Sequence, residues 1–278
     1  MTNNENAIME RNSFLLPTVM EGDFSQEDFG DDFDGLQLSF QRVKIPSGGT
    51  IQFEVPGDDP EDPNYEKFIE GVIIYNHASN AYWPSGSEYD ETVNPICSSV
   101  DGKVGFGDPG CACAMCDFNK FGSDPNGKGK LCKNMRTLYI LRSGEAMPIQ
   151  LSLPPTSIRP FTEFVNSVFV SRHRPSWSAV VQIGLKKVDN GTNVYSVATF
   201  RKTGDFAGEE LAAIKQYAAT FREQIKLMQQ QRAVSNENRL EADVVYDNDP
   251  AYTSAENGSH FAIAHAQVVN GSNDELPL

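Results

Sequence analysis

Short stretches of alternating hydrophobic and polar residues recur along the chain and predict β-strands. Residues 50–55 alternate with a period of two, residues 71–75 form a compact apolar run, and Pro and Gly residues between them break the chain. Residues 136–142 and 148–153 flank a Ser-Gly-Glu turn and predict a hairpin. Most of the ordered chain is therefore expected to be β.

A second predicted hairpin gives the strongest local signal. Residues 179–188 and 193–200 are rich in β-branched and apolar residues and are joined by Asp189-Asn190-Gly191. The Asn-Gly pair adopts the positive backbone angles that a tight hairpin turn requires.

Two helices are predicted from apolar residues spaced three and four apart. The first follows Pro154-Pro155, carries its apolar residues between 158 and 169, and is expected to be capped by Thr156 or Ser157. The second spans roughly 207–231 and has one apolar face, which is expected to be packing surface.

This order of elements predicts a mainly β (α+β) fold: an OB-like β-barrel with an inserted zinc-binding loop and a long C-terminal helix. The barrel domain is expected at 36–232 with the insertion at about 97–133. Residues 1–35 are expected to form a disordered acidic arm and residues 233–278 a flexible acidic tail. A sandwich, or a separate zinc ribbon beside a small mixed domain, fits the same pattern.

Charge is strongly segregated. The chain has 23 basic and 38 acidic residues, a net charge of −15, yet residues 120–202 hold 13 basic and four acidic residues, a net charge of +9. The remainder therefore carries −24. A polyanion would be attracted to the central segment and repelled by both ends. Without an apolar run of about 18 residues or a basic-then-apolar leader, a cytoplasmic protein without membrane contact is expected.

All five cysteines lie between residues 97 and 132. Cys113 and Cys116 form a Cys-x-x-Cys turn, and Cys97 and Cys132 stand 15 residues to either side. Four thiolates at such spacing are typical of a structural Zn²⁺ site, which leaves no open position for catalysis. Cys111 is then spare, although the sequence alone also permits a set that uses Cys111 with Cys116 and leaves Cys113 free. Buried thiols or disulfides are the alternatives to a metal.

Aromatic residues are interleaved with the central cations, which favours a groove for single-stranded nucleic acid. Seven basic residues are predicted to neutralise phosphates and three rings to stack on bases. They are Lys128, Lys130, Lys133, Arg136, Arg172, Arg174 and Lys186, with Tyr139, Trp177 and Tyr195.

The chain ends in Asp274-Glu275-Leu276-Pro277-Leu278. This end resembles the acidic tip of bacterial single-stranded DNA-binding proteins, which in that family recruits replication and repair partners and competes with DNA for the basic groove. Leu278 stands where that family usually ends in Phe, so the aromatic anchor for the partner is missing here.

A second resemblance covers residues 71–225. The segments Cys113-Ala-Met-Cys116, Phe121-Gly122 and 127–134, followed by 153–157 and 195–200, resemble phage and mobile-element proteins of single-stranded DNA metabolism. The resemblance implies Cys97, Cys113, Cys116 and Cys132 as the metal set and supplies no catalytic residue.

No enzyme is expected. Residues 122–128 match the start of a P-loop, but Gly129 stands where a Ser or Thr hydroxyl is needed, and the four histidines form no catalytic or metal pattern. The expected function is that of a bacteriophage-type single-stranded DNA-binding protein, and assembly into a homo-oligomer is compatible with that function. It would coat DNA without sequence specificity in replication, recombination and repair. The alternatives are a zinc-stabilised protein-interaction or transcription-control module and an accessory subunit of a nucleic-acid-processing enzyme.

Overall fold

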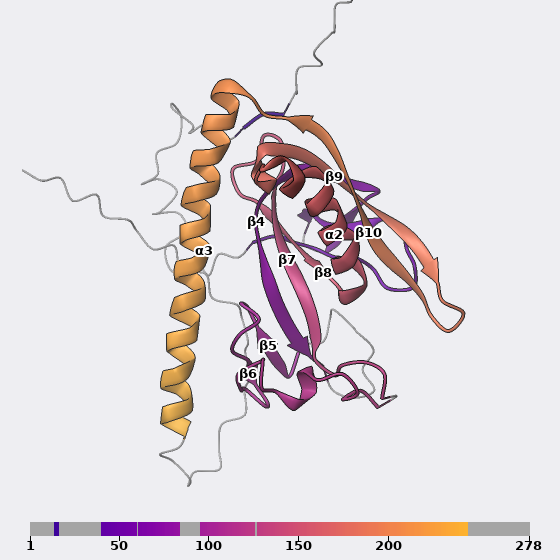
Figure 1. Ribbon diagram of the computed structural model, residues 1–278, viewed down its shortest axis with the longest axis vertical. Coiled ribbons are helices and arrows are strands. Elements are labelled where there is room, and N and C mark those ends of the chain that lie inside the picture. The colour runs from indigo at the N-terminus through magenta and orange to yellow at the C-terminus, as the bar shows by residue number, and fades with distance from the viewer. Residues whose placement is uncertain (1–13, 17–39, 60, 84–94, 126, 244–278) are drawn as a thin grey trace, which may run out of the picture.

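The computed structural model describes residues 14–16, 40–59, 61–83, 95–125 and 127–243 (Figure 1), and side chains as far as residue 226. This part of the chain is mainly β. The strands are β1 (Arg42–Val43), β2 (Phe53–Asp59), β3 (Asp62–Glu66), β4 (Phe68–Tyr82), β5 (Cys97–Ser99), β6 (Phe106–Gly107), β7 (Lys133–Leu141), β8 (Ile149–Leu153), β9 (Ala179–Asp189) and β10 (Val194–Asp205). The helices are α2 (Pro155–Val168) and α3 (Gly208–Asp243), with 3-10 turns η1 (Asp117–Asn119), η2 (Val170–Arg172) and η3 (Ser176–Ser178).

Most strands belong to one eight-stranded sheet, which curls into half a barrel. Its main path is β1-β8-β7-β4-β5-β6, and β9 joins it at β4 and carries β10 on its outer side. Strands β2 and β3 form a separate two-stranded hairpin.

The long strand β4 is shared by both halves of the sheet. Its first residues, 68–71, pair with β9, and residues 72–81 pair with β7. A Cβ on Gly71, where the partner changes, would lie 2.5 Å from the carbonyl oxygen of Leu141. Glycine therefore permits the close backbone approach at the bend between the two halves.

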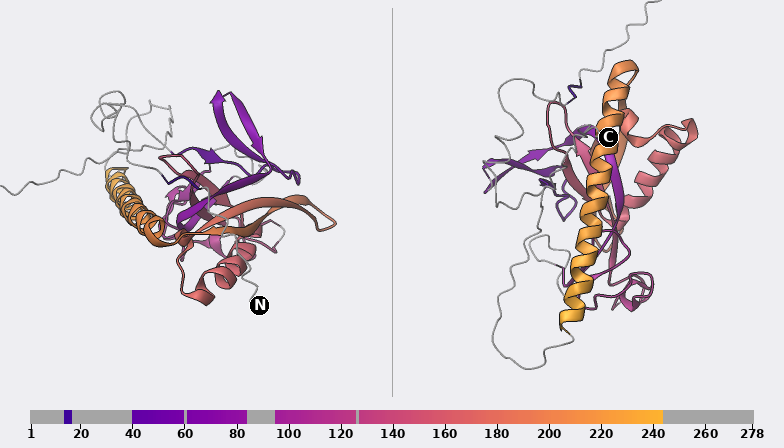
Figure 2. Two further views of the ribbon diagram at one scale, coloured as in Figure 1. Left: turned by 90° about the horizontal axis from the view of Figure 1, so that it is seen from above. Right: turned by 90° about the vertical axis from the view of Figure 1, so that its left-hand side faces the viewer.

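Two hydrophobic clusters lie on opposite faces of the sheet. On β7, Leu138 and Ile140 face the cluster that includes Phe161 of α2, whereas Tyr139 and Leu141 face the cluster that includes Phe221 of α3. This division follows from the two-residue period of a strand. Figure 2 shows the two helices on different sides of the strands.

The expected secondary structure is largely present. The hairpins predicted at 136–153 and 179–200 are β7–β8 and β9–β10, and the expected mainly β, α+β class is confirmed. Strand β2 continues through Pro56-Gly57, where a break was predicted. Helix α3 extends to Asp243, beyond the expected start of the tail, in a segment rich in good helix formers. The N-terminal arm, apart from residues 14–16, and residues 244–278 lie outside the described residues.

The predicted cap of the first helix is wrong. Helix α2 begins at Pro155 with Pro154 as N-cap, and no side chain caps it. Ser157 is instead fully buried, and its hydroxyl oxygen accepts the backbone N–H of Ala198 at 2.9 Å. This bond fixes α2 against β10.

We predict that Ser157→Ala lowers the free energy of unfolding by about 1 to 3 kcal/mol, because it leaves the buried N–H of Ala198 without an acceptor. Urea denaturation monitored by circular dichroism would measure the loss. The adjacent exposed residue supplies the control: Thr156→Ala should change the free energy by less than about 0.5 kcal/mol. Equal effects of the two substitutions would contradict the assigned role of Ser157.

Candidate functional site

The five cysteines surround one small cavity in the segment between β4 and β7, here named the cysteine insertion (residues 95–132). The cavity has a volume of about 10 Å³, and its wall also includes Tyr82 and Phe118. Cys113 and Cys132 are buried, whereas Cys97, Cys111 and Cys116 are partly exposed, and all five thiols are free. A cavity of this volume accommodates about one water molecule.

Backbone contacts hold the cysteines in place. The N–H of Cys113 donates to Lys103 O at 2.7 Å, and the N–H of Cys132 donates to Phe118 O at 2.8 Å. A Cβ on Gly105 would lie 2.9 Å from the Cys97 sulfur, so a glycine is needed there to admit the thiol.

The thiols influence one another's ionisation. Burial, reinforced by the nearby Cys113 and Cys116, raises the pKa of Cys132 to about 11. Burial also raises the pKa of Cys97, and a hydrogen bond with Cys116 raises the pKa of Cys111. The cysteines therefore form one interacting group that includes Cys111.

The thiols do not, however, converge to coordination distance. Within the described ranges, no three His, Cys, Asp or Glu side chains are grouped closely enough to hold a metal ion. The donor type and number do fit Zn²⁺, which is bound by four cysteines in many structural sites. Coordination would require the sulfur atoms to move closer together.

An open groove lies between α2 and β10, with a volume of about 610 Å³. We name it the basic groove, because three cations line it: Lys186 from β9, and Arg201 and Lys202 from β10. Its wall also includes Phe164 and Phe200, whose rings stack with centroids 5.6 Å apart. The carboxylate of Glu163 is turned to Arg159, at 2.8 Å.

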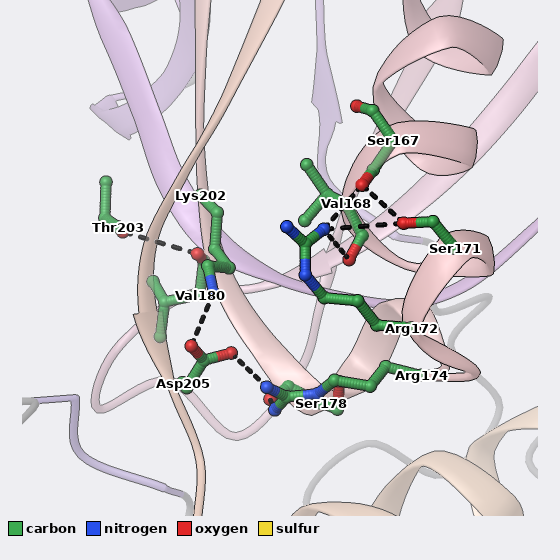
Figure 3. Close-up of polar contacts among 10 residues, drawn as sticks. All are labelled: Ser167, Val168, Ser171, Arg172, Arg174, Ser178, Val180, Lys202, Thr203 and Asp205. Carbon is green, nitrogen blue, oxygen red and sulfur yellow. Dashed lines mark hydrogen bonds and ion pairs between the residues drawn. The ribbon is translucent and has the colours of Figure 1, made fainter.

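Two further arginines are connected by polar contacts to residues that line the basic groove (Figure 3). Arg172 Nη1 donates to the carbonyl oxygens of Ser167 and Val168, both of which line the groove, at 2.5 and 3.3 Å. Arg174 forms a 2.6 Å ion pair with Asp205, and the other carboxylate oxygen of Asp205 pairs with Lys202. Asp205 thus holds two cations side by side.

Of the seven predicted basic residues, Lys186 lines the basic groove, and Arg172 and Arg174 are connected by polar contacts to residues that line it. Lys128 and Lys133 are exposed elsewhere, on the loop that follows Cys116 and at the start of β7. Lys130 is partly buried, and its ammonium donates to the side-chain oxygens of Asn119 and Asn134.

Arg136 is also committed to internal contacts. Its Nε donates to Asn76 Oδ1 at 2.7 Å, and its guanidinium lies 5.8 Å from the centre of the Phe161 ring. Burial lowers its pKa. This residue contributes to the packing of α2 on the sheet.

Of the three rings predicted to stack on bases, Tyr139 is buried, whereas Trp177 and Tyr195 are partly exposed. Tyr139 is only 6 % exposed, lies against Phe221 of α3, and hydrogen-bonds to His77 at 3.3 Å. It therefore presents no open ring face, because the period of β7 turns it beneath α3. Trp177 packs partly buried against the same cluster, whereas Tyr195 is half-buried on β10.

Phe200, Arg201 and Lys202 belong to the basic groove and were missing from the predicted site. The alternation along residues 193–200 and the basic pair directly after it were the available signals. The predicted partner-binding tip, Asp274–Leu278, lies outside the described residues.

Searches with family models, against curated proteins and among solved structures found no match to this chain. In the part of the chain that the structure describes, no helix has the length and apolar character to cross a membrane.

We predict that Arg174→Ala lowers the free energy of unfolding by roughly 1.5 to 3 kcal/mol. The substitution removes the ion pair with Asp205 and the bonds to Ser178 from a side chain that is only 31 % exposed. Lys186→Ala, an exposed position on β9, should change it by less than about 0.5 kcal/mol. Thermal and urea denaturation would compare the two, and the reverse order would contradict this division between a structural and an exposed cation.

Proposed function

We propose that this protein binds single-stranded DNA without sequence specificity, and that the basic groove between α2 and β10 carries the binding. The supporting observation is that Lys186, Arg201 and Lys202 line one groove, and that Arg172 and Arg174 are connected by polar contacts to its lining residues. The basic groove is therefore cationic, although the whole chain has a net charge of −15.

The shape of the basic groove favours a single strand over a duplex. Its volume of about 610 Å³ is that of a small-ligand site, which suits one or two nucleotides. Lys186 pairs with Val197 in the hairpin, and Arg201 lies four residues further along β10 on the same strand face, or roughly 13 Å away. Cations spaced along a strand neutralise successive phosphates and read no bases.

The connectivity of the strands also fits this proposal. We propose that β4, β7, β8, α2, β9 and β10 form an open OB-type core. The antiparallel pairs β4–β7, β7–β8, β4–β9 and β9–β10, with a helix between β8 and β9, fit that connectivity. Strand β8 pairs in parallel with β1, so the barrel stays open on that side. In OB-folds, the connections that would correspond to the cysteine insertion and the β9–β10 turn contact oligonucleotides.

In this proposal a structural Zn²⁺ is held by Cys97, Cys113, Cys116 and Cys132. The ion would link the two ends of the cysteine insertion and keep its basic loop at a fixed position beside β4. Cys111 is the alternative ligand, since it lines the same cavity and contacts Cys116.

The cellular role follows from the same proposal and from the resemblances in the sequence. The protein would coat single-stranded DNA during replication, recombination and repair in the cytoplasm, as bacteriophage proteins do in their host. Residues Asp274–Leu278 would recruit partner proteins.

A second candidate function is a zinc-stabilised protein-interaction module. It is favoured by apolar side chains exposed on the cysteine insertion, among them Met115 at 78 % and Ile96 at 41 %. A protein that binds no oligonucleotide at low salt but retains zinc would favour this candidate.

We predict about one zinc ion per chain in protein purified without chelator, measured by elemental analysis. Cys132→Ser should abolish zinc retention, because it removes a buried thiol and leaves only three of the four proposed ligands. Cys111→Ser should retain it. Loss of zinc from Cys111→Ser together with retention in Cys113→Ser would select the alternative ligand set, and a zinc-free wild-type protein would refute the site.

We predict that Lys186→Ala weakens binding to labelled oligo(dT) and lowers the slope of log K against log salt by about 0.7, the value for one phosphate contact on a single strand. Fluorescence anisotropy at several salt concentrations measures both quantities. Lys215→Ala removes an exposed lysine from α3, away from the basic groove, and should leave the slope unchanged. Wild-type binding that does not depend on salt would refute the proposed function.

A further inference from the structure

The cysteine insertion exposes one aromatic ring to an unusual degree. Phe121 is 82 % exposed, the highest value among the large hydrophobic residues of the described part of the chain. A phenylalanine placed in water contributes nothing to the core, and its surface is available to a ligand.

The backbone beneath Phe121 is nevertheless well anchored. The N–H of Gly122 donates to Gly129 O at 2.8 Å, across the loop. The hydroxyl of Ser123 donates to Phe118 O and accepts the N–H of Leu131, both at 3.0 Å. The ring is therefore presented from a fixed position.

One face of the Phe121 ring is occupied by a cation. Lys130 Nζ lies 4.9 Å from the ring centroid, within the range of a cation–π contact. The same ammonium donates to the side-chain oxygens of Asn119 and Asn134, at 3.1 and 3.0 Å, and these two hydrogen bonds fix its position. The rest of the ring surface stays open.

The charge around the ring is positive. Residues 117–133 contain four lysines and two aspartates, a net charge of +2. Lys128 and Lys133 are exposed, and the Lys133 ammonium donates to Lys130 O at 2.9 Å, which places it close to the loop that carries the ring. An open ring among cations favours a nucleobase with its phosphate over the apolar side chain of a protein partner.

We propose that Phe121 is a base-stacking residue and that the cysteine insertion is a second contact point for single-stranded nucleic acid, separate from the basic groove. This inference rests on the proposed function. It assigns the stacking role to a ring on the insertion, in place of the covered Tyr139.

The test compares Phe121→Ala with wild-type protein in binding oligo(dT), by anisotropy at fixed salt. Loss of one stacked base should weaken binding roughly 5- to 150-fold. Because no phosphate contact is removed, the slope of log K against log salt should stay unchanged. Phe121→Trp should retain the affinity and add a tryptophan signal that is quenched on binding.

Met115→Ala provides the matched control, since Met115 is 78 % exposed on the same insertion. It should bind oligo(dT) as the wild type does. On an abasic strand of the same length, wild type and Phe121→Ala should bind equally, because no base is present to stack.

Different failures have different meanings. If wild-type protein binds oligo(dT) with the expected salt dependence and Phe121→Ala binds equally well, the stacking role is wrong and the proposed function stands. If wild-type protein binds no oligo(dT), both the stacking role of Phe121 and the proposed function are refuted. Equal weakening by Met115→Ala, or a change of oligomeric state in Phe121→Ala by analytical ultracentrifugation without a change in DNA affinity, would overturn the stacking role in favour of a protein contact.

Discussion

The pairing of one strand with two different partners underlies the architecture. Strand β4 continues from β9 to β7 without a break, and the change of partner occurs where Gly71 lets the Leu141 carbonyl approach. A side chain at that position would push the two halves of the sheet apart. The two faces of β7, which the two-residue period of the strand separates, pack against α2 and α3, and the far end of β4 leads into the cysteine insertion.

The basic groove depends on how helix α2 covers the edge of β10. Strand β10 pairs with β9 alone among the described strands, so its outer edge would be open if α2 did not lie beside it. Ser157 accepts a hydrogen bond from that edge and sets the spacing between helix and strand. Uncovered edges promote association with other chains, and a helix or a bound ligand beside them reduces that tendency.

Cations in this molecule have two physical roles. Arg136 and Arg174 are held by neighbouring side chains and stabilise the fold, while Lys186 and Lys128 are exposed and suit contacts with phosphates. The proposed nucleic-acid surface thus consists of exposed charges supported by paired ones. Asp205 shows how this is arranged, because one carboxylate offsets the repulsion between Arg174 and Lys202.

The sequence by itself determined the local elements and the chemistry they carry. Periodicity located both hairpins and both helices, close spacing in the chain brought the cysteines together, and the charge count identified the cationic third. These features depend on near neighbours. Only the tertiary structure decided that α3 covers Tyr139, that Asp205 engages Arg174, and that Phe200 and Lys202 face α2. Each of these outcomes depends on which distant element packs against a strand face, and the period of a single strand carries no information about that partner.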